Sequence, residues 1–255
     1  MRWGEKRYHS LDYELKQMFK EKVYKIALNG GMTCPNRDGH VGTGGCIFCS
    51  SQGSGDFAGS ARLSIAEQIR QGKADISSKR PVHSYIAYFQ AFTNTYAPVE
   101  TLRALYMEAI ADPEVKILSI ATRPDCLGAD VLALLDEINH IKPVWVELGL
   151  QTIHPETSAY IRRGYELSVF EQAVKELRAI GITVIVHTIL YLPGETKDDM
   201  LDTIHYLNHM DIQGIKLQLL HVLTHTDLAA DYEKHPFYIP DMQDYIQFLG
   251  TCIAQ

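Results

Sequence analysis

The sequence predicts an α/β fold, namely a partial parallel (β/α)6 barrel of the TIM-barrel type with an N-terminal extension. Six apolar, β-branched runs recur along the 255 residues, and helical patterns lie between them. The runs are continuous rather than alternating, which is typical of strands buried on both faces of a parallel sheet. Six strand–helix units are fewer than the eight that close the commonest barrel, so we expect an open barrel.

Each predicted strand is a short run rich in Val, Ile, Leu, Tyr or Phe. The runs cover residues 24–29, 84–90, 116–122, 144–150, 183–190 and 215–222. The segments between them repeat apolar residues at helical spacing and predict helices at 65–77, 99–112, 129–139, 168–180 and 197–210. Pro98 stands where a helix tolerates a missing N–H, and Gly181 stands where a helix commonly ends. A last helical pattern over 241–255 has no stop signal, so we expect the chain to be truncated at its C-terminus.

We expect one domain over residues 23–255, preceded by an extension over residues 1–22. No low-complexity linker interrupts the predicted units. Residues 1–25 hold seven Lys/Arg and four Asp/Glu, whereas the whole chain has a net charge of −7. Two interpretations of this basic segment stay open, a solvated terminal helix or a small arm for phosphate or nucleic acid. The acidic balance of the whole chain excludes a strongly basic nucleic-acid-binding protein.

Composition excludes several broad classes of protein. Hydrophobic residues make up 46% of the chain and charged residues 22%, which is too apolar for an intrinsically disordered protein. No run of about eighteen apolar residues is present, so the sequence predicts no membrane span and no membrane partner. Residues 1–10 lack the apolar core of a signal peptide, and we expect a cytoplasmic protein. In that reducing compartment, five cysteines point to metal binding, catalysis or burial rather than to disulfides.

Three of the cysteines fall in one glycine-rich segment directly after the first predicted strand. Cys34, Cys46 and Cys49 have the spacing C-x11-C-x2-C, and four glycines lie between the first two. The two close thiolates can reach a single metal centre, and a flexible glycine-rich loop can bring the third. Because the segment is polar, it is not an ordinary core that happens to contain cysteines. It is therefore a candidate metal site.

On spacing alone, two kinds of metal centre fit equally. A structural zinc site needs four ligands, so His40 would have to complete it. An iron–sulfur cluster is held by cysteine thiolates, and with only three of them one iron stays open for a substrate or cofactor. The residues themselves leave this choice open.

The same cysteines carry a resemblance to a known family. Together with Phe48, which precedes the last of them, they resemble the cluster loop of the radical S-adenosylmethionine (SAM) superfamily. The long first gap is similar to that of the branch containing the catalytic subunit of Elongator, and residues 33–39 resemble a small bacterial family within it. The resemblance covers residues 22–227. It implies a [4Fe–4S] cluster on Cys34, Cys46 and Cys49, with SAM as the second cofactor.

Other parts of the resemblance lie at predicted strand ends, where barrel enzymes carry their chemistry. The turn after the second strand takes the place of the superfamily's Gly-Gly-Glu-like turn, so Gln90, Thr93 or Asn94 would contact the methionine amine of SAM. Glu147 would bind the ribose hydroxyls, and Arg163 would be a partner of the SAM carboxylate. In full, the resemblance implies a cofactor site made of Phe48, Gln90, Thr93, Asn94, Arg123, Glu147, Gln151, Arg163 and Tyr191.

Two cysteines lie outside the glycine-rich segment. Cys126 closely follows the third predicted strand and is a candidate catalytic residue facing the pocket. Cys252 lies in an apolar helical stretch, and we expect it to be buried.

The resemblance implies a radical SAM enzyme. Such an enzyme cleaves SAM reductively with its [4Fe–4S] cluster, and the resulting 5′-deoxyadenosyl radical removes a hydrogen atom from the substrate. The Elongator-like branch implies tRNA as the substrate, with the wobble-uridine side chain remodelled from carboxymethylaminomethyl to aminomethyl. It also implies an electron donor such as flavodoxin or ferredoxin. Two alternatives stay open, a radical SAM enzyme acting on a small metabolite and a zinc-stabilised binding module without catalysis.

Overall fold

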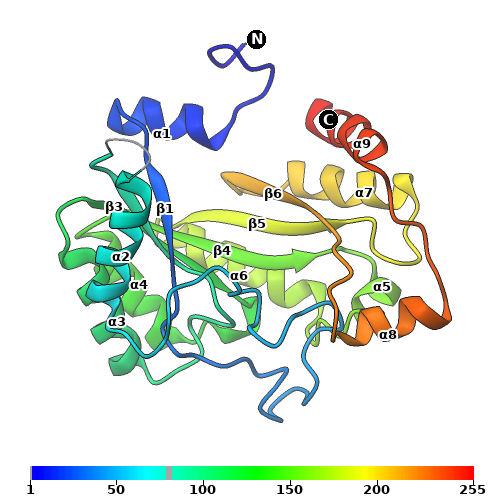
Figure 1. Ribbon diagram of the computed structural model, residues 1–255, viewed down its shortest axis with the longest axis horizontal. Helices are drawn as coiled ribbons and strands as arrows, with labels where there is room; N and C mark the ends of the chain where they lie inside the picture. The colour runs from blue at the N-terminus through cyan, green and yellow to red at the C-terminus, as the bar shows by residue number, and fades with distance from the viewer. Residues whose placement is uncertain (1, 79–81) are drawn as a thin grey trace.

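The computed structural model describes residues 2–78 and 82–255, which form one six-stranded sheet with helices around it (Figure 1). Neighbouring strands are parallel, and they follow one another in sequence order across the sheet. The strands are β1 (Tyr24–Leu28), β2 (Tyr85–Phe89), β3 (Val115–Thr122), β4 (Val144–Gln151), β5 (Thr183–Leu190) and β6 (Gly214–Leu219). The sheet curves into a half-barrel, which confirms the predicted fold class.

The helices lie mainly between consecutive strands, as the sequence predicts. They are α1 (Leu11–Phe19), α2 (Ile65–Ser77), α3 (Val99–Ala111), α4 (Ala129–Asn139), α5 (Pro155–Tyr160), α6 (Leu167–Ala179), α7 (Lys197–Asn208), α8 (Asp227–Lys234) and α9 (Met242–Ala254). A 3-10 turn, η1 (Pro124–Cys126), follows β3. The sequence pattern does not predict α5 and α8, because helices of six and eight residues are too short to show a helical period.

The convex face of the sheet carries the main hydrophobic core. Leu118 of β3 and Val146 of β4 are fully buried there, and α2, α3, α4 and α6 pack against the strands. Burying such a side chain stabilises the fold by about 1.5–3 kcal/mol relative to leaving it in water. Alternate residues of each strand face this core, and the residues between them face the concave side. Both sets are largely apolar, which accounts for the continuous apolar runs.

The concave face is apolar at its amino end. Ile86, Ile117 and Trp145 lie near the beginnings of their strands, and Leu15 of α1 and Val23 belong to the same apolar cluster. Leu15 is only 3% exposed, so α1 is more than a solvated terminal helix. It closes the amino end of the half-barrel, and the basic segment before it lies at that end too (Figure 1).

The last helix forms a smaller apolar cluster with the end of β5 and with α7. Phe248 and Cys252 of α9 belong to it together with Met200 and Ile204 of α7. Cys252 is 3% exposed, which confirms its predicted burial. Within residues 2–78 and 82–255, no helix combines the length and apolar character needed to cross a membrane.

Candidate functional site

A cavity opens at the carboxyl ends of the strands, next to the loop that follows β1. Its lining includes ten of the residues that the sequence singles out, which are Cys34, Cys46, Phe48, Cys49, Gln90, Thr93, Arg123, Glu147, Gln151 and Arg163. They come from the ends of β2 and β3, from β4 and from two loops, so the parallel topology brings them together. Glu147 and Cys49 lie on the same cavity, as the predicted placement requires.

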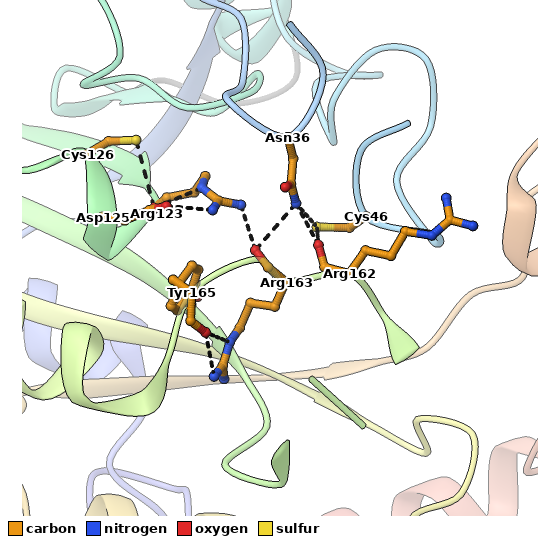
Figure 2. A network of polar contacts seen from close by, with 9 residues as sticks. Asn36, Cys46, Arg123, Asp125, Cys126, Arg162, Arg163 and Tyr165 are labelled. Carbon is orange, nitrogen blue, oxygen red and sulfur yellow. Dashed lines mark hydrogen bonds and ion pairs between the residues drawn. The ribbon is translucent and has the colours of Figure 1, made fainter. Parts of the chain in front are cut away.

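The cysteine loop is tied to the segment after α5 by one buried asparagine. The side-chain amide of Asn36 donates to the carbonyl oxygen of Arg162 at 2.6 Å and to that of Arg163 at 3.3 Å (Figure 2). The same amide nitrogen lies 3.5 Å from the sulfur of Cys46. Gly45 has a φ of 75°, and a Cβ there would come within 2.9 Å of the side chain of Arg37. Only glycine adopts this turn without cost, which explains one glycine of the loop.

The three loop thiols fit a cluster better than a single metal ion. In the part of the chain that the structure describes, no three His, Cys, Asp or Glu side chains converge closely enough to hold one ion. His40, the candidate fourth zinc ligand, lies instead with its ring centroid 6.4 Å from that of Tyr96 in a separate groove. A cubane needs no convergence on one point, because its thiolates bind different iron atoms. In this structure His40 does not join the three thiols as the fourth ligand of a zinc site.

Cys46 lies next to Cys49 and to the side-chain amide of Asn36. Burial, together with the nearby Cys49, raises the pKa of Cys46 to about 11. A buried thiol loses its proton readily only when a positive centre compensates for the missing water. Binding of iron would supply that compensation and would release the proton.

Arg123 and Arg163 are largely committed to the protein itself. Arg123 forms a two-pronged ion pair with Asp125, at 2.9 and 2.6 Å, and donates to the carbonyl oxygen of Arg163 at 2.8 Å (Figure 2). Burial lowers the pKa of Arg163, whose guanidinium donates to the carbonyl oxygens of Thr152 and Tyr165 at 2.6 and 3.0 Å. Both arginines thus fix the backbone of the segment that packs beside Cys46. The role of Arg163 at the SAM carboxylate stays a prediction, because few of its N–H groups remain free.

Glu147 lies four residues before the end of β4, deeper in the half-barrel than a strand end. Its carboxylate accepts hydrogen bonds from Lys25, Ser119 and His187. Burial by itself would raise the pKa of Glu147, but the hydrogen bond from His187 and the charge of Lys25 outweigh burial and lower it. Its contact with ribose therefore stays a prediction that these bonds do not favour.

Gln151 stands at the end of β4 with a φ of 68°, next to a register irregularity between β4 and β5. A left-handed residue beside such an irregularity redirects the chain and its side chain. Gln151 lines the cavity four residues beyond Glu147. It is therefore better placed than Glu147 to contact a ligand near the cysteine loop.

Three of the predicted site residues lie outside the lining of this cavity. Asn94 is fully buried, and its amide donates to the carbonyl oxygens of Phe89 and Ala121. Tyr191 has a φ of 65° and turns towards α9, where its ring centroid lies 5.5 Å from that of Phe248. Cys126 lines the separate groove beside η1. Burial and the adjacent Asp125 raise the pKa of the Cys126 thiol to about 12, which keeps it protonated. Their functional roles stay predictions.

Sequence reasoning missed the residues at the bottom of the cavity. Tyr88, His187, Lys216 and Gln218 line it together with Glu147. A signal was present, because His187 and Lys216 are polar interruptions in otherwise apolar strands. An ionisable side chain inside a buried strand needs a partner from another strand, and sequence does not show which.

Comparisons with known proteins agree with this geometry. A sequence profile described as the Radical SAM superfamily matches residues 36–207, which is more than half of the chain. The chain is 46% identical over 245 residues to the uncharacterized protein YtqA of Bacillus subtilis, covering 96% of this chain and 76% of that protein. It is 38% identical over 242 residues to protein YhcC of Escherichia coli, covering 94% and 77%.

Solved structures show the same fold at low sequence identity. The archaeal Methanocaldococcus infernus Elp3 aligns with a TM-score of 0.69 and 15% identity, over 90% of this chain and 53% of that one. Coproporphyrinogen III oxidase (HemN) from Escherichia coli aligns with a TM-score of 0.60 and 15% identity, over 96% and 55%. The chain thus spans about half the length of these two proteins. By its sequence profile and its relatives, the chain belongs to the radical SAM superfamily, and a [4Fe–4S] cluster and S-adenosylmethionine are its cofactors.

Proposed function

We propose that this chain is the core of a radical SAM enzyme that remodels the side chain of a wobble uridine in tRNA. The observation that carries the enzyme assignment is the cavity in which all three cysteines of the x11, x2 loop face the strand ends. When bound there, the cluster and SAM supply abstraction of a hydrogen atom from an unactivated carbon. Cys34, Cys46 and Cys49 would hold the cluster.

The chain's own residues would position the ligands at the carboxyl ends of the strands and exclude water from the amino end of the half-barrel. Gln90 and Thr93 line the cavity beside the cysteine loop, and Gln151 does so at the end of β4. Below them, the apolar cluster under α1 fills the amino end of the half-barrel and excludes water. Apolar filling below the cavity protects a reactive species from solvent on that side.

The charge of the cavity supports an anionic substrate. The whole chain has a net charge of −7, yet the cavity lining holds Arg37, Arg163 and Lys216 against Glu147 as its acidic side chain, besides Arg123, which is paired with Asp125. Local positive charge on an acidic protein favours a substrate such as RNA. The particular choice of a wobble uridine, trimmed from carboxymethylaminomethyl to aminomethyl, rests on the resemblance to the Elongator-like branch.

Nucleoside analysis of a strain that lacks the gene tests this proposal. We expect tRNA from the strain to accumulate 5-carboxymethylaminomethyluridine and to lose nucleosides that derive from 5-aminomethyluridine. Mass spectrometry of digested tRNA measures both, and the gene restored on a plasmid is the control. An unchanged set of wobble nucleosides would exclude the tRNA substrate and favour a small metabolite.

Substitution of Arg2, Lys6 and Arg7 by alanine is expected to weaken tRNA binding without abolishing catalysis. These exposed residues precede α1, which closes the amino end of the half-barrel, so they would contact the body of the tRNA away from the cavity. The plot of log K against log salt concentration has a negative slope, and loss of three phosphate contacts should reduce its magnitude by about 2–3. Filter binding at several salt concentrations measures the slope, and uncoupled SAM cleavage should be unchanged. A slope equal to that of the unmodified protein would show that the basic segment before α1 does not contact RNA and is only a solvated segment.

A further inference from the structure

The floor of the cavity is a polar layer to which each of the six strands contributes one side chain. In strand order the layer contains Lys25, Tyr88, Ser119, Glu147, His187 and Lys216. The register places neighbouring inward residues in phase, for example His187 beside Lys216. The apolar cluster under α1 lies below this layer, and the cysteine loop lies above it.

Glu147 is already balanced by one of the two lysines of the layer. Lys25 and Ser119 donate to its Oε1, and His187 lies 2.7 Å from its Oε2. The Nζ of Lys216 forms a longer ion pair with Oε2 at 3.8 Å, which is beyond hydrogen-bond distance. Burial lowers the pKa of His187 and favours its neutral form. With two lysines and one carboxylate, the layer carries one positive charge in excess, and Lys216 has the more distant contact with Glu147.

Lys216 and its neighbour Gln218 face the cavity from β6. The side chain of Lys216 is 42% exposed, whereas that of Glu147 is fully buried. Gln218 lies two residues further along the same strand and also lines the cavity. Its side-chain oxygen is buried and has no hydrogen-bond partner among the described residues. An ammonium, which is a donor, and a carboxamide with an acceptor oxygen unpartnered in the described chain thus stand on the same strand at the cavity floor.

Stability does not explain a charged layer inside a barrel. Apolar side chains of similar volume are often as stable as buried ion pairs, or more stable, because desolvation of the charges costs more than their attraction returns. The cluster under α1 shows that this half-barrel can be filled with apolar residues. Buried ionisable groups gathered in a cavity are more typical of ligand recognition.

We propose that Lys216 binds a carboxylate of the substrate at the cavity floor. The ammonium of Lys216 pairs with the carboxylate, and the side-chain oxygen of Gln218, unpartnered among the described residues, accepts a hydrogen bond from an N–H of the same ligand. Lys25, Glu147 and His187 are positioning residues, because Lys25 and His187 hold the carboxylate of Glu147, with which Lys216 makes its longer ion pair. One excess charge matches a carboxylate, whereas a phosphate dianion would need further cations, and Arg123 and Arg163 are committed elsewhere.

The identity of this carboxylate rests on the proposed function, under which it is the end of the carboxymethylaminomethyl side chain. A carboxylate held at the floor places the carbon next to it above the polar layer, on the side of the cysteine loop. The product, which has an aminomethyl group, lacks the carboxylate. The site would therefore distinguish substrate from product.

Ligand binding to the anaerobically reconstituted protein tests the site directly. Calorimetric titration compares 5-carboxymethylaminomethyluridine with 5-aminomethyluridine, and line broadening of labelled acetate measures carboxylate binding independently of any nucleoside. We expect Lys216→Met to weaken binding of acetate and of the acidic nucleoside at least tenfold and to leave the aminomethyl nucleoside unaffected. Lys216→Arg should retain most of the affinity. Lys197→Met is the matched control, because Lys197 also lies over an aromatic ring, that of Phe248, but outside the cavity.

The two kinds of probe separate this inference from the proposed function. Equal acetate and acidic-nucleoside affinities in the unmodified protein and in Lys216→Met would overturn the carboxylate site, whatever the tRNA analysis shows. Acetate binding that depends on Lys216, without binding of either nucleoside, would support the site and exclude the wobble uridine. Melting temperatures of the variants confirm that each is folded.

Discussion

Replacement of Cys34, Cys46 or Cys49 by alanine is expected to abolish the iron–sulfur cluster. The unmodified protein, reconstituted without oxygen, should contain about four irons and four sulfides per chain, as in a cubane cluster. Because these three thiols are the cysteines that line the cavity, loss of one leaves only two protein ligands. Iron and sulfide analysis and the visible absorption of the cluster measure the loss. SAM cleavage should disappear with it.

The two remaining cysteines provide controls within the same chain. Cys252 is buried in the cluster of α9, and Cys126 lines the groove beside η1. Alanine at either position should leave the iron and sulfide content unchanged. One zinc per chain without sulfide would contradict the assignment, and so would a full complement of iron in Cys34→Ala.

Glu147→Gln is expected to destabilise the protein by about 3–5 kcal/mol, because removal of one partner leaves a buried charge uncompensated. Lys25 and Lys216 would then face each other across the layer without a carboxylate between them. Denaturant unfolding under anaerobic conditions measures the change. Lys25→Met in the same chain should recover part of the loss, since it removes the charge left unpaired. Glu156→Gln, on the exposed surface of α5, is the matched control.

The pH dependence of this effect has a definite sign. The folded-state pKa of Glu147 is lowered, so its stabilising contribution is present above the ordinary carboxyl pKa and is lost as the pH falls towards the folded value. The stability difference between the unmodified protein and Glu147→Gln should therefore be constant near neutrality and shrink in strong acid. Equal stability at neutral pH, with weaker SAM binding alone, would favour the ribose contact that the resemblance implies.

Local sequence was sufficient for the fold and for the metal ligands. Continuous apolar runs such as the one ending at Leu190 predict strands buried on both faces, and the parallel half-barrel follows from six of them. The cysteine ligands were equally accessible, because Cys46 and Cys49 are separated by two residues and Cys34 precedes them in the same loop. Features carried by a short segment of chain can be recognised without its surroundings.

The roles of the polar side chains were decided by the tertiary structure. Arg163 lies near the cavity as predicted, but backbone carbonyls of residues brought near by the turn after α5 take up most of its donors. Tyr191 is directed to α9 by a left-handed residue conformation that its sequence position does not announce. In both cases a neighbour or a single backbone angle, rather than the residue type, determines what the side chain contacts.

The sequence by itself determined the fold class, the cysteine loop and the edge of the sheet at which the cavity opens. It did not reveal the polar layer, because Lys25, Glu147 and His187 are separated by 122 and 40 residues and meet only when the strands align in register. A charged residue in an apolar strand costs free energy until a partner from another strand compensates for it. Which partner does so depends on the register of the whole half-barrel, so only the tertiary structure showed that Glu147 contacts Lys25 more closely than Lys216.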